Sequence, residues 1–265
     1  MVDGIAEVNE NCTLCGGCVD FCEVDALKIE GREHEGKDAL VDWSGIWVYA
    51  ECRHGRVAPV TYELLGAGRK LADQKKVPLS AVLLTDKAGD IPAELISYGA
   101  DQVYVVEDHA LAEFTDEAYG NALEDLARKY KPEVILAGAT AIGRSFIPRV
   151  ATSLKTGLTA DCTQLDIQAE DGALLQTRPA FGGNIMATIA CPNTRAERAT
   201  VRPLVMKANE PDLGRTGEVI NCNIAPERLV SRVKVRKFVP LEGDQVNLNE
   251  ADIVVSGGRG LENEK

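Results

Sequence analysis

The chain has 265 residues, with 29 basic and 41 acidic side chains, a formal net charge of −12, and 45% hydrophobic but only 5% aromatic residues. This composition excludes a disordered tail and a basic nucleic-acid binder, and the length fits one large domain plus a small one, since domains usually hold about 100–200 residues. No apolar run approaches the roughly 20 residues that a bilayer requires, and no basic, apolar leader follows Met1. We therefore expect a cytoplasmic protein with neither a membrane nor a nucleic acid as partner.

An acidic segment opens the chain. Residues 1–45 contain eleven acidic and three basic side chains, so this short stretch carries a net charge of −8. It also holds four of the eight cysteines, namely Cys12, Cys15, Cys18 and Cys22. The concentration of charge and of cysteine predicts a small unit that is separate from the rest of the chain.

The four clustered cysteines are spaced C-x₂-C-x₂-C-x₃-C, as in bacterial ferredoxins, where such thiolates hold an iron–sulfur cluster. Gly16 and Gly17 lie within the run and let the backbone wrap around a metal. A structural zinc site normally uses two separated C-x₂-C pairs, so zinc is the alternative and iron–sulfur is favoured. The spacing predicts one [4Fe–4S] cluster, with short strands at Val24–Ile29 and Ala39–Asp42 around it.

The fourth ligand of this cluster is less clearly indicated than the first three. Cys22 is followed by Glu23 where proline is usual, and no second cysteine run supplies the thiolate that two-cluster ferredoxins exchange. Cys52 is the nearest other candidate, but it comes directly after the first strand of the next domain, where a buried or interface cysteine is expected. We favour Cys22. The remaining cysteines, Cys162, Cys191 and Cys222, are expected to be small buried hydrophobic residues.

Strands and helices alternate in the next part of the chain. Buried apolar runs predict the strands, and apolar residues at helical spacing predict the helices. The predicted strands are 46–50, 79–84, 102–106 and 134–137, and the predicted helices are 62–74, 93–98, 119–130 and 146–154. Repeated β–α units of this kind predict an α/β fold with a parallel sheet covered by helices and right-handed connections.

The pattern changes after Gly157. Strands are predicted at 163–167, 174–178, 186–190 and 200–205, which makes this part rich in β structure. Glu218–Glu242 is predicted to be extended, and its basic residues belong either to an edge strand or to a solvated face. Ala251–Gly260 (ADIVVSGGRG) is predicted to be a buried strand that opens into a glycine-rich turn of the kind that approaches phosphates. Because no helix follows in this sequence, we expect the remainder of a domain to be missing from it.

Two segments of the α/β region are candidate binding sites. Residues 138–144 (GATAIGR) join a predicted strand to a predicted helix, which places Arg144 at the carboxyl end of the sheet, where ligands usually bind. Residues 178–184 (RPAFGGN) set Arg178 and Asn184 beside Gly182 and Gly183, which allow another group to approach the main chain. The alternatives are an ordinary strand-to-helix turn in the first segment and a surface arginine beside a turn in the second.

Residues 46–205 resemble the α subunit of electron-transfer flavoproteins. The resemblance lies in four blocks whose order and spacing match this one family: IWVYAEC, APVTYELLGAGRKLAD, VILAGATAIGRSFIPRVATSLKTGLTADCTQLDI and QTRPAFGGNIMATIACP. The N-terminal cysteine module is similar to the extension on α subunits of electron-bifurcating flavoprotein complexes from anaerobes.

The resemblance implies three parts in the chain. They are a ferredoxin-like [4Fe–4S] module over 1–45, the parallel-sheet N-terminal α/β domain of the α subunit over 46–245, and a linker with the first strand of a missing FAD-binding domain over 246–265. In the family, the SGGRG turn, here Gly257, Gly258 and Arg259, approaches the pyrophosphate of the α-subunit FAD.

The resemblance also implies a second flavin contact. The block with Arg178, Gly182, Gly183 and Asn184 is expected to face an FAD held mainly by the β subunit. Arg178 would lie near the isoalloxazine ring, where a cation stabilises the anionic reduced flavin. Arg144 is expected to contribute from the neighbouring turn.

The function implied is electron transfer. We expect an α subunit that relays electrons between flavins, the [4Fe–4S] cluster and a partner dehydrogenase in flavin-based electron bifurcation in an anaerobe, and that turns over no substrate by itself. Its partners would be the β subunit, a flavin-dependent dehydrogenase and ferredoxin. The alternatives are a free-standing α/β enzyme that binds an adenine nucleotide and carries a cluster, and a structural zinc module. The first strand is followed by no G-x-G-x-x-G motif, and the chain has no P-loop, which disfavours the enzyme.

Overall fold

The structure, a computed structural model, describes residues 42–191, 194–237, 251 and 253–261. The chain divides into two units, Met1–Val41 and Asp42–Lys265, and all the described residues belong to the second. The predicted cluster ligands Cys12, Cys15, Cys18 and Cys22 lie outside the described residues, as do the strand predicted at 24–29 and most of the one predicted at 39–42.

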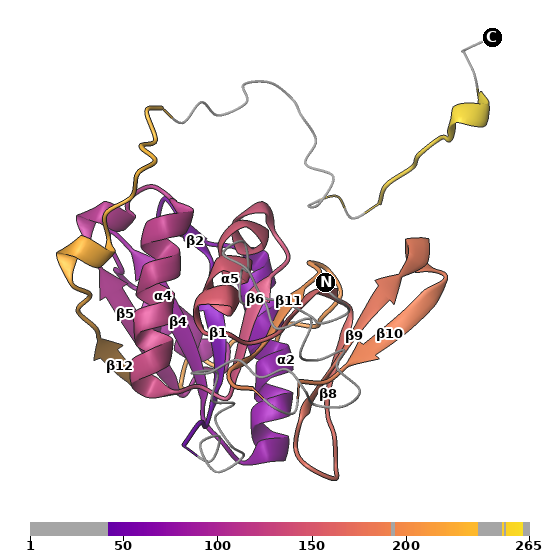
Figure 1. The fold of residues 1–265 in the computed structure, drawn as a ribbon, viewed down its shortest axis with the longest axis horizontal. Helices are drawn as coiled ribbons and strands as arrows, with labels where there is room; N and C mark the ends of the chain where they lie inside the picture. Colours follow the sequence, from indigo (N-terminus) through magenta and orange to yellow (C-terminus); the bar gives the residue numbers. More distant parts are fainter. Residues whose placement is uncertain (1–41, 192–193, 238–250, 252, 262–265) are drawn as a thin grey trace, which may run out of the picture. The chain divides into compact units, whose positions relative to one another are not determined.

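A seven-stranded sheet forms the centre of the second unit, and all six pairings between its neighbouring strands are parallel. The strand order is β12-β5-β4-β1-β6-β11-β7 (Figure 1). The strands are β1 (Ile46–Ala50), β4 (Leu79–Thr85), β5 (Gln102–Glu107), β6 (Val134–Gly138), β7 (Leu158–Cys162), β11 (Glu197–Val201) and β12 (Glu218–Asn221). The predicted α/β fold with a parallel sheet is thus confirmed.

Helices cover both faces of this sheet, so each face has its own apolar core. In β1, at the middle of the sheet, Val48 points into the core under α2 and α3, whereas Tyr49 points into the core under α4 and α5. The helices are α2 (Pro59–Lys75), α3 (Ile91–Ser97), α4 (Asp116–Tyr130) and α5 (Ala141–Ser153). No helix in the described part of the chain is both long and apolar enough to span a membrane.

The helices begin earlier than the apolar periodicity indicated. α5 starts at Ala141 rather than near 146, because Thr140 caps it by accepting a hydrogen bond from the Gly143 N–H at 3.0 Å. α4 ends close to the predicted position, where Lys131 adopts a left-handed conformation with φ 50° just before Pro132. Caps and breakers, rather than the apolar stripe, set these boundaries.

A smaller antiparallel sheet lies between β7 and β11 along the chain. Its strands are β8 (Gln164–Ile167), β9 (Leu174–Ala180) and β10 (Ile185–Ile189), in the order β10-β9-β8. These agree with the strands predicted at 163–167, 174–178 and 186–190. Because β7 and β11 are parallel neighbours, this sheet is the crossover that joins them. In Figure 1 the β9–β10 hairpin extends away from the central sheet.

Two strands of the central sheet differ from the predictions. β11 covers Glu197–Val201 instead of 200–205, because Arg202 and Pro203 end it, and its charged residues Glu197 and Arg198 are buried. β7 was not predicted at all, since its sequence LTADC lacks an apolar run. Two very short strands, β2 (Cys52–Arg53) and β3 (Arg56–Val57), pair in a turn after β1 and were also missed.

The region predicted to be extended over 218–242 is extended only in part. β12 is an edge strand of the central sheet, but a 3₁₀ turn at Pro226–Arg228 follows it. Arg228 bonds Asp125 with its Nε at 3.0 Å from Oδ2, and Arg232 bonds Glu117, so α4 neutralises two of the basic residues. The prediction for 218–237 was one extended edge strand or a solvated basic face. The structure instead has a short edge strand, β12, followed by a segment that forms ion pairs with α4.

The buried strand predicted within Ala251–Gly260 is also wrong. Ile253, Val254 and Val255 are exposed and have no strand structure, and a single 3₁₀ turn follows at Arg259–Leu261. A β strand needs a neighbour for its backbone hydrogen bonds. No strand of the described residues pairs with this segment.

A buried carboxylate in the central sheet bonds the main chain of the small antiparallel sheet. The carboxylate of Glu197, in β11, accepts a hydrogen bond from the backbone N–H of Leu174 in β9, at 3.2 and 3.3 Å from its two oxygens. Arg195 approaches the same carboxylate at 3.4 Å. Nearby, the Lys75 ammonium donates to the Gly172 carbonyl at 2.5 Å. Burial outweighs these partners and raises the pKa of Glu197 to about 7.

Glu197→Gln should remove a pH-dependent loss of stability. The folded protein binds a proton at Glu197 up to about pH 7, whereas the unfolded chain releases it near the ordinary value of 4.5. Glu197 therefore contributes fully to the free energy of unfolding below pH 4.5. This contribution, about 2–3 kcal/mol, is lost as the pH rises through about 7. Urea unfolding of both proteins between pH 4.5 and 8 should show a stability difference that grows in favour of the variant. If the free energies of unfolding of the two proteins changed in parallel with pH, this prediction would be wrong. Asp166→Asn, at an exposed position of β8, is the control.

Candidate functional site

The carboxyl end of the central sheet is the first part of the candidate site. α5 starts there directly after β6, and Thr140 both caps α5 and donates a hydrogen bond to Glu51 Oε2 at 2.5 Å. Glu51 follows β1, and burial raises its pKa although the Thr140 bond acts in the opposite direction. A Cβ on Gly143 would lie 1.9 Å from the Gly138 carbonyl oxygen, so only glycine allows this helix to start so close to the strand.

Asp161, near the end of β7, gathers arginines at this edge of the sheet. Its carboxylate accepts hydrogen bonds from Arg202 Nη2 at 2.6 Å, from Arg202 Nε at 3.2 Å and from Arg144 Nη2 at 3.2 Å. Its own conformation is left-handed, with φ 64°, and its N–H bonds Thr200 Oγ1 at 3.0 Å. The Arg202 hydrogen bond lowers the pKa of Asp161, and the charges of Arg202, Arg144 and Arg178 lower it further.

We call Arg144, Arg178, Arg202 and Asp161 the arginine cluster. Two of these cations, Arg144 and Arg202, bond the carboxylate, and the charge of Arg178 acts on it from farther away, so the cluster keeps an excess of positive charge beside the N-terminus of α5, which also favours anions. Arg144, predicted from one segment, bonds the carboxylate, and the charge of Arg178, predicted from another, acts on the same carboxylate. Arg202 was missed, because it fell inside the strand predicted at 200–205, whereas β11 ends at Val201.

Arg178 lies on the side of β9 that faces the main body, because it shares a face with the buried residues Leu174 and Gln176. Its Nε is buried and has no hydrogen-bond partner within the described structure. A buried donor without an acceptor is uncommon in folded proteins. This donor therefore suits a bound anionic or acceptor group at the arginine cluster.

The rest of the RPAFGGN segment lies elsewhere. Gly182 and Gly183, with φ of 73° and 92°, form the turn at the tip of the β9–β10 hairpin, and Asn184 follows. A Cβ on either glycine would meet no atom within 4 Å, so the main chain there is open to another molecule. The structure thus separates Arg178 at the arginine cluster from Gly182, Gly183 and Asn184 at the hairpin tip.

The predicted phosphate turn is described only in part. Gly257 and Gly258 are exposed and precede the 3₁₀ turn Arg259–Leu261, while the side chain of Arg259 lies outside what the structure describes. A Cβ on Gly257 would lie 2.4 Å from Leu261 Cδ1, so the turn folds closely on itself.

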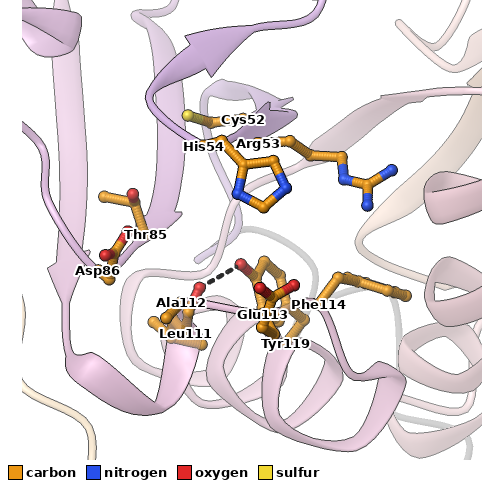
Figure 2. Close-up of a pocket in the computed structure, with 10 residues that line it drawn as sticks. All are labelled: Cys52, Arg53, His54, Thr85, Asp86, Leu111, Ala112, Glu113, Phe114 and Tyr119. Atoms are coloured by element: carbon orange, nitrogen blue, oxygen red, sulfur yellow. Dashed lines mark hydrogen bonds between the residues drawn. The ribbon is translucent and has the colours of Figure 1, made fainter. Parts of the chain in front are cut away.

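A small pocket at the same end of the sheet contains Cys52, the alternative cluster ligand. Figure 2 shows it between the loop after β1, the end of β4 and the segment before α4, with Tyr119 donating to the Leu111 carbonyl at 2.7 Å. Cys52 is buried in the core, and this burial raises its pKa. Cluster ligation needs a thiolate, so this environment disfavours Cys52 as a ligand. Among the described residues, no group of three or more His, Cys, Asp or Glu side chains is arranged to hold a metal.

The predictions for the other cysteines agree with the structure in two cases of three. Cys162 and Cys222 are buried, while Cys191 is only partly buried. Burial raises the pKa of the Cys162 thiol to about 12, in spite of the opposing charge of Arg178. Cys162 is therefore a neutral core residue beneath the arginine cluster.

Comparison with known proteins identifies the region around this site. The electron transfer flavoprotein domain matches residues 46–227. The chain is 51% identical over 220 residues to the electron transfer flavoprotein subunit alpha of Thermoanaerobacterium thermosaccharolyticum, covering 83% of this chain and 66% of the relative. It is 45% identical over 222 residues to protein FixB of Clostridium saccharobutylicum, covering 84% of this chain and 66% of the relative.

A third relative matches a longer stretch. The lactate dehydrogenase (NAD(+),ferredoxin) subunit LctC of Acetobacterium woodii is 40% identical over 259 residues, which cover 98% of this chain and 61% of the relative. This match therefore includes most of the N-terminal segment with the four clustered cysteines. The chain spans a little under two thirds of the length of the relatives it matches.

Gly143→Ala should destabilise the protein, because its methyl group would overlap the Gly138 carbonyl oxygen and push α5 away from β6. Overpacking of this kind typically costs about 1–3 kcal/mol. The free energy of unfolding measured in urea should fall by that amount. Ser145→Ala, at an exposed position of the same helix, is the control and should change it little; equal stability of the two variants would show that the strand-to-helix turn tolerates a side chain.

Proposed function

Since the chain belongs to the electron transfer flavoprotein family, we propose that it is an α subunit that relays electrons between flavins, an N-terminal [4Fe–4S] cluster and a partner dehydrogenase. The observation that carries this proposal is the arginine cluster within the matched domain, at the carboxyl end of its parallel sheet. A site with excess positive charge and an unpartnered buried donor suits a cofactor that becomes anionic on reduction.

The flavin contacts are proposed for individual residues. A bound flavin accepts and passes on electrons and gains negative charge when reduced. Arg178 would stabilise that charge directly, with Arg144 beside it, and Asp161 would orient Arg144 and Arg202. The hairpin tip would contact the same flavin, or the β subunit that holds it, through the open main chain at Gly182, Gly183 and Asn184. Gly257, Gly258 and Arg259 are proposed to bind the pyrophosphate of a second FAD.

The iron–sulfur cluster is proposed from the chemistry of the donor set. Cys12, Cys15, Cys18 and Cys22 have ferredoxin spacing, and soft thiolates select iron–sulfur clusters. Support comes from the A. woodii relative, whose match includes most of this segment. The burial of Cys52 favours Cys22 as the fourth ligand.

The partners are proposed to be an electron-transfer flavoprotein β subunit, which would hold the flavin next to Arg178, a flavin-dependent dehydrogenase, and ferredoxin. With these partners the chain would take part in flavin-based electron bifurcation. The name of the A. woodii relative, which includes NAD(+), ferredoxin and lactate dehydrogenase, supports this class of reaction. The test is whether a complex of these partners oxidises NADH and passes electrons to ferredoxin only while a second acceptor of higher potential is reduced in the same turnover.

Cys15→Ser should abolish the cluster and leave the domain over 46–227 folded, because the thiolates belong to a separate segment. Purified anaerobically, the wild-type chain should contain about four iron and four sulfide and be brown, whereas the variant should contain neither. Zinc without sulfide in the wild type would contradict the proposal. Cys22→Ser should reduce the iron content strongly and Cys52→Ser should not; the opposite ranking would make Cys52 the fourth ligand.

Arg178→Ala should lower the reduction potential of the flavin in the complex with the β subunit. Loss of a nearby cation disfavours the anionic reduced form, by about 1–3 kcal/mol where the charges are desolvated. Potentiometric titration of the complex measures this shift. Arg128→Ala, which removes an exposed cation of α4, is the control, and an unchanged potential in the Arg178 variant would place Arg178 away from the ring.

A further inference from the structure

β11 carries two buried charged side chains that point to opposite faces of the central sheet. Glu197 bonds Leu174, which belongs to the core under α2 and α3. Arg198 is the next residue and points the other way, because neighbours in a strand alternate. It lies in register with Ile135 of β6, in the core under α4 and α5, and is 0% exposed. A guanidinium group is therefore enclosed in an apolar core.

Most of this guanidinium group has no hydrogen-bond partner. Its Nη1 donates to Thr156 Oγ1 at 2.7 Å, in the turn that follows α5. Its Nε and Nη2 are buried, and neither has an acceptor among the residues that the structure describes. Buried donors are nearly always paired, and an unpaired donor on a charged group is especially unfavourable. Both atoms therefore call for an acceptor from outside the described chain.

The positive charge of Arg198 is also unbalanced. Burial alone lowers its pKa, to about 10, and no carboxylate of the described residues acts in the opposite direction. The side chain therefore keeps its proton at neutral pH. Glu197, by contrast, has the guanidinium group of Arg195 beside it. An isolated charge in an apolar core is unfavourable unless an opposite charge accompanies it.

The end of α5 does not supply the missing acceptors. The last carbonyl groups of a helix lack partners within it and therefore attract cations. Here the carbonyl groups of residues 150–152 already accept hydrogen bonds from the backbone N–H groups of residues 154–156. The Ser153 carbonyl accepts one from Arg128 at 2.7 Å. The Thr156 hydroxyl donates to the Ala196 carbonyl at 2.9 Å, so it is also in use.

We propose that the Nε and Nη2 atoms of Arg198 bind a small monovalent inorganic anion of the chloride class, beneath the turn that follows α5. Two N–H donors and one positive charge match a halide, which accepts hydrogen bonds and carries one negative charge. A water molecule would accept a hydrogen bond but leave the charge unbalanced. The ligand must be small because apolar side chains enclose the group, and Thr156 is only partly buried, so an ion can enter from this side.

The site would link folding to the concentration of the anion. Arg198 is the second residue of β11, so the site lies at the amino end of the sheet and does not depend on the proposed function. The bound ion would hold the end of α5 to β11, on which α5 packs. Because the unfolded chain has no such site, the anion stabilises the folded protein by mass action.

The test measures the melting temperature of the full chain at constant ionic strength, in sodium gluconate and in sodium chloride. Replacing about 0.3 M gluconate, an anion too large for the site, with chloride should raise the melting temperature of the wild type by about 2–4 °C. Arg198→Met removes the charge and keeps an apolar side chain in its place, so this variant should melt at the same temperature in both salts. Lys155→Ala, which removes an exposed cation from the same turn, is the control and should respond like the wild type.

Crystals of the wild type grown in bromide give a second measurement that does not require the variant to fold. Anomalous scattering should place a bromide ion within hydrogen-bond distance of Nε and Nη2 of Arg198. The proposal is overturned if chloride leaves the melting temperature of the wild type unchanged, or if Arg198→Met responds as strongly as the wild type. It is also overturned if a water molecule or a carboxylate occupies the position. A bromide ion there without any effect of chloride on melting would show an adventitious ion only.

Discussion

A sheet whose seven strands are all parallel must be covered on both faces, and this constraint governs the architecture of the described domain. The chain must return across the sheet between consecutive strands of the central sheet, and four of these connections supply the helices that form the two apolar cores. The same rule brings the carboxyl ends of all strands to one edge. Residues that follow different strands, such as Glu51, Thr140 and Arg202, therefore gather at that edge although they are far apart in the sequence.

The candidate site depends on one carboxylate at that edge. Asp161 binds Arg202 through two hydrogen bonds and Arg144 through one, and the nearby charge of Arg178 also acts on it. A single negative charge is enough to hold the arginines together but not to neutralise them. The excess positive charge and the N-terminus of α5 lie at the same edge of the sheet, and each of them favours negatively charged groups.

The small antiparallel sheet connects this site to the surface. As the crossover between β7 and β11, it is attached at both ends to strands of the central sheet, and Glu197 fastens its inner part through a buried hydrogen bond. Its outer strand has no cover in the described residues. One crossover thus carries Arg178 on its inner strand and exposed apolar side chains on its outer strand.

The first four strands of the central sheet and its four helices could be predicted from the sequence, because buried strands such as IWVYA and LSAVLL have apolar runs that only a covered parallel sheet can bury. The sequence also indicated Arg144 and Arg178 as separate candidates. That Arg144 and Arg202 meet at Asp161, within reach of the charge of Arg178, depends on the fold, because contacts between a helix start and two strand ends leave no local pattern. The buried residues Glu197 and Arg198 and the strand LTADC escaped prediction for the same reason: their burial depends on neighbours supplied by other strands. Ile253, Val254 and Val255 show the converse, since these apolar residues form no strand where the described structure offers no partner.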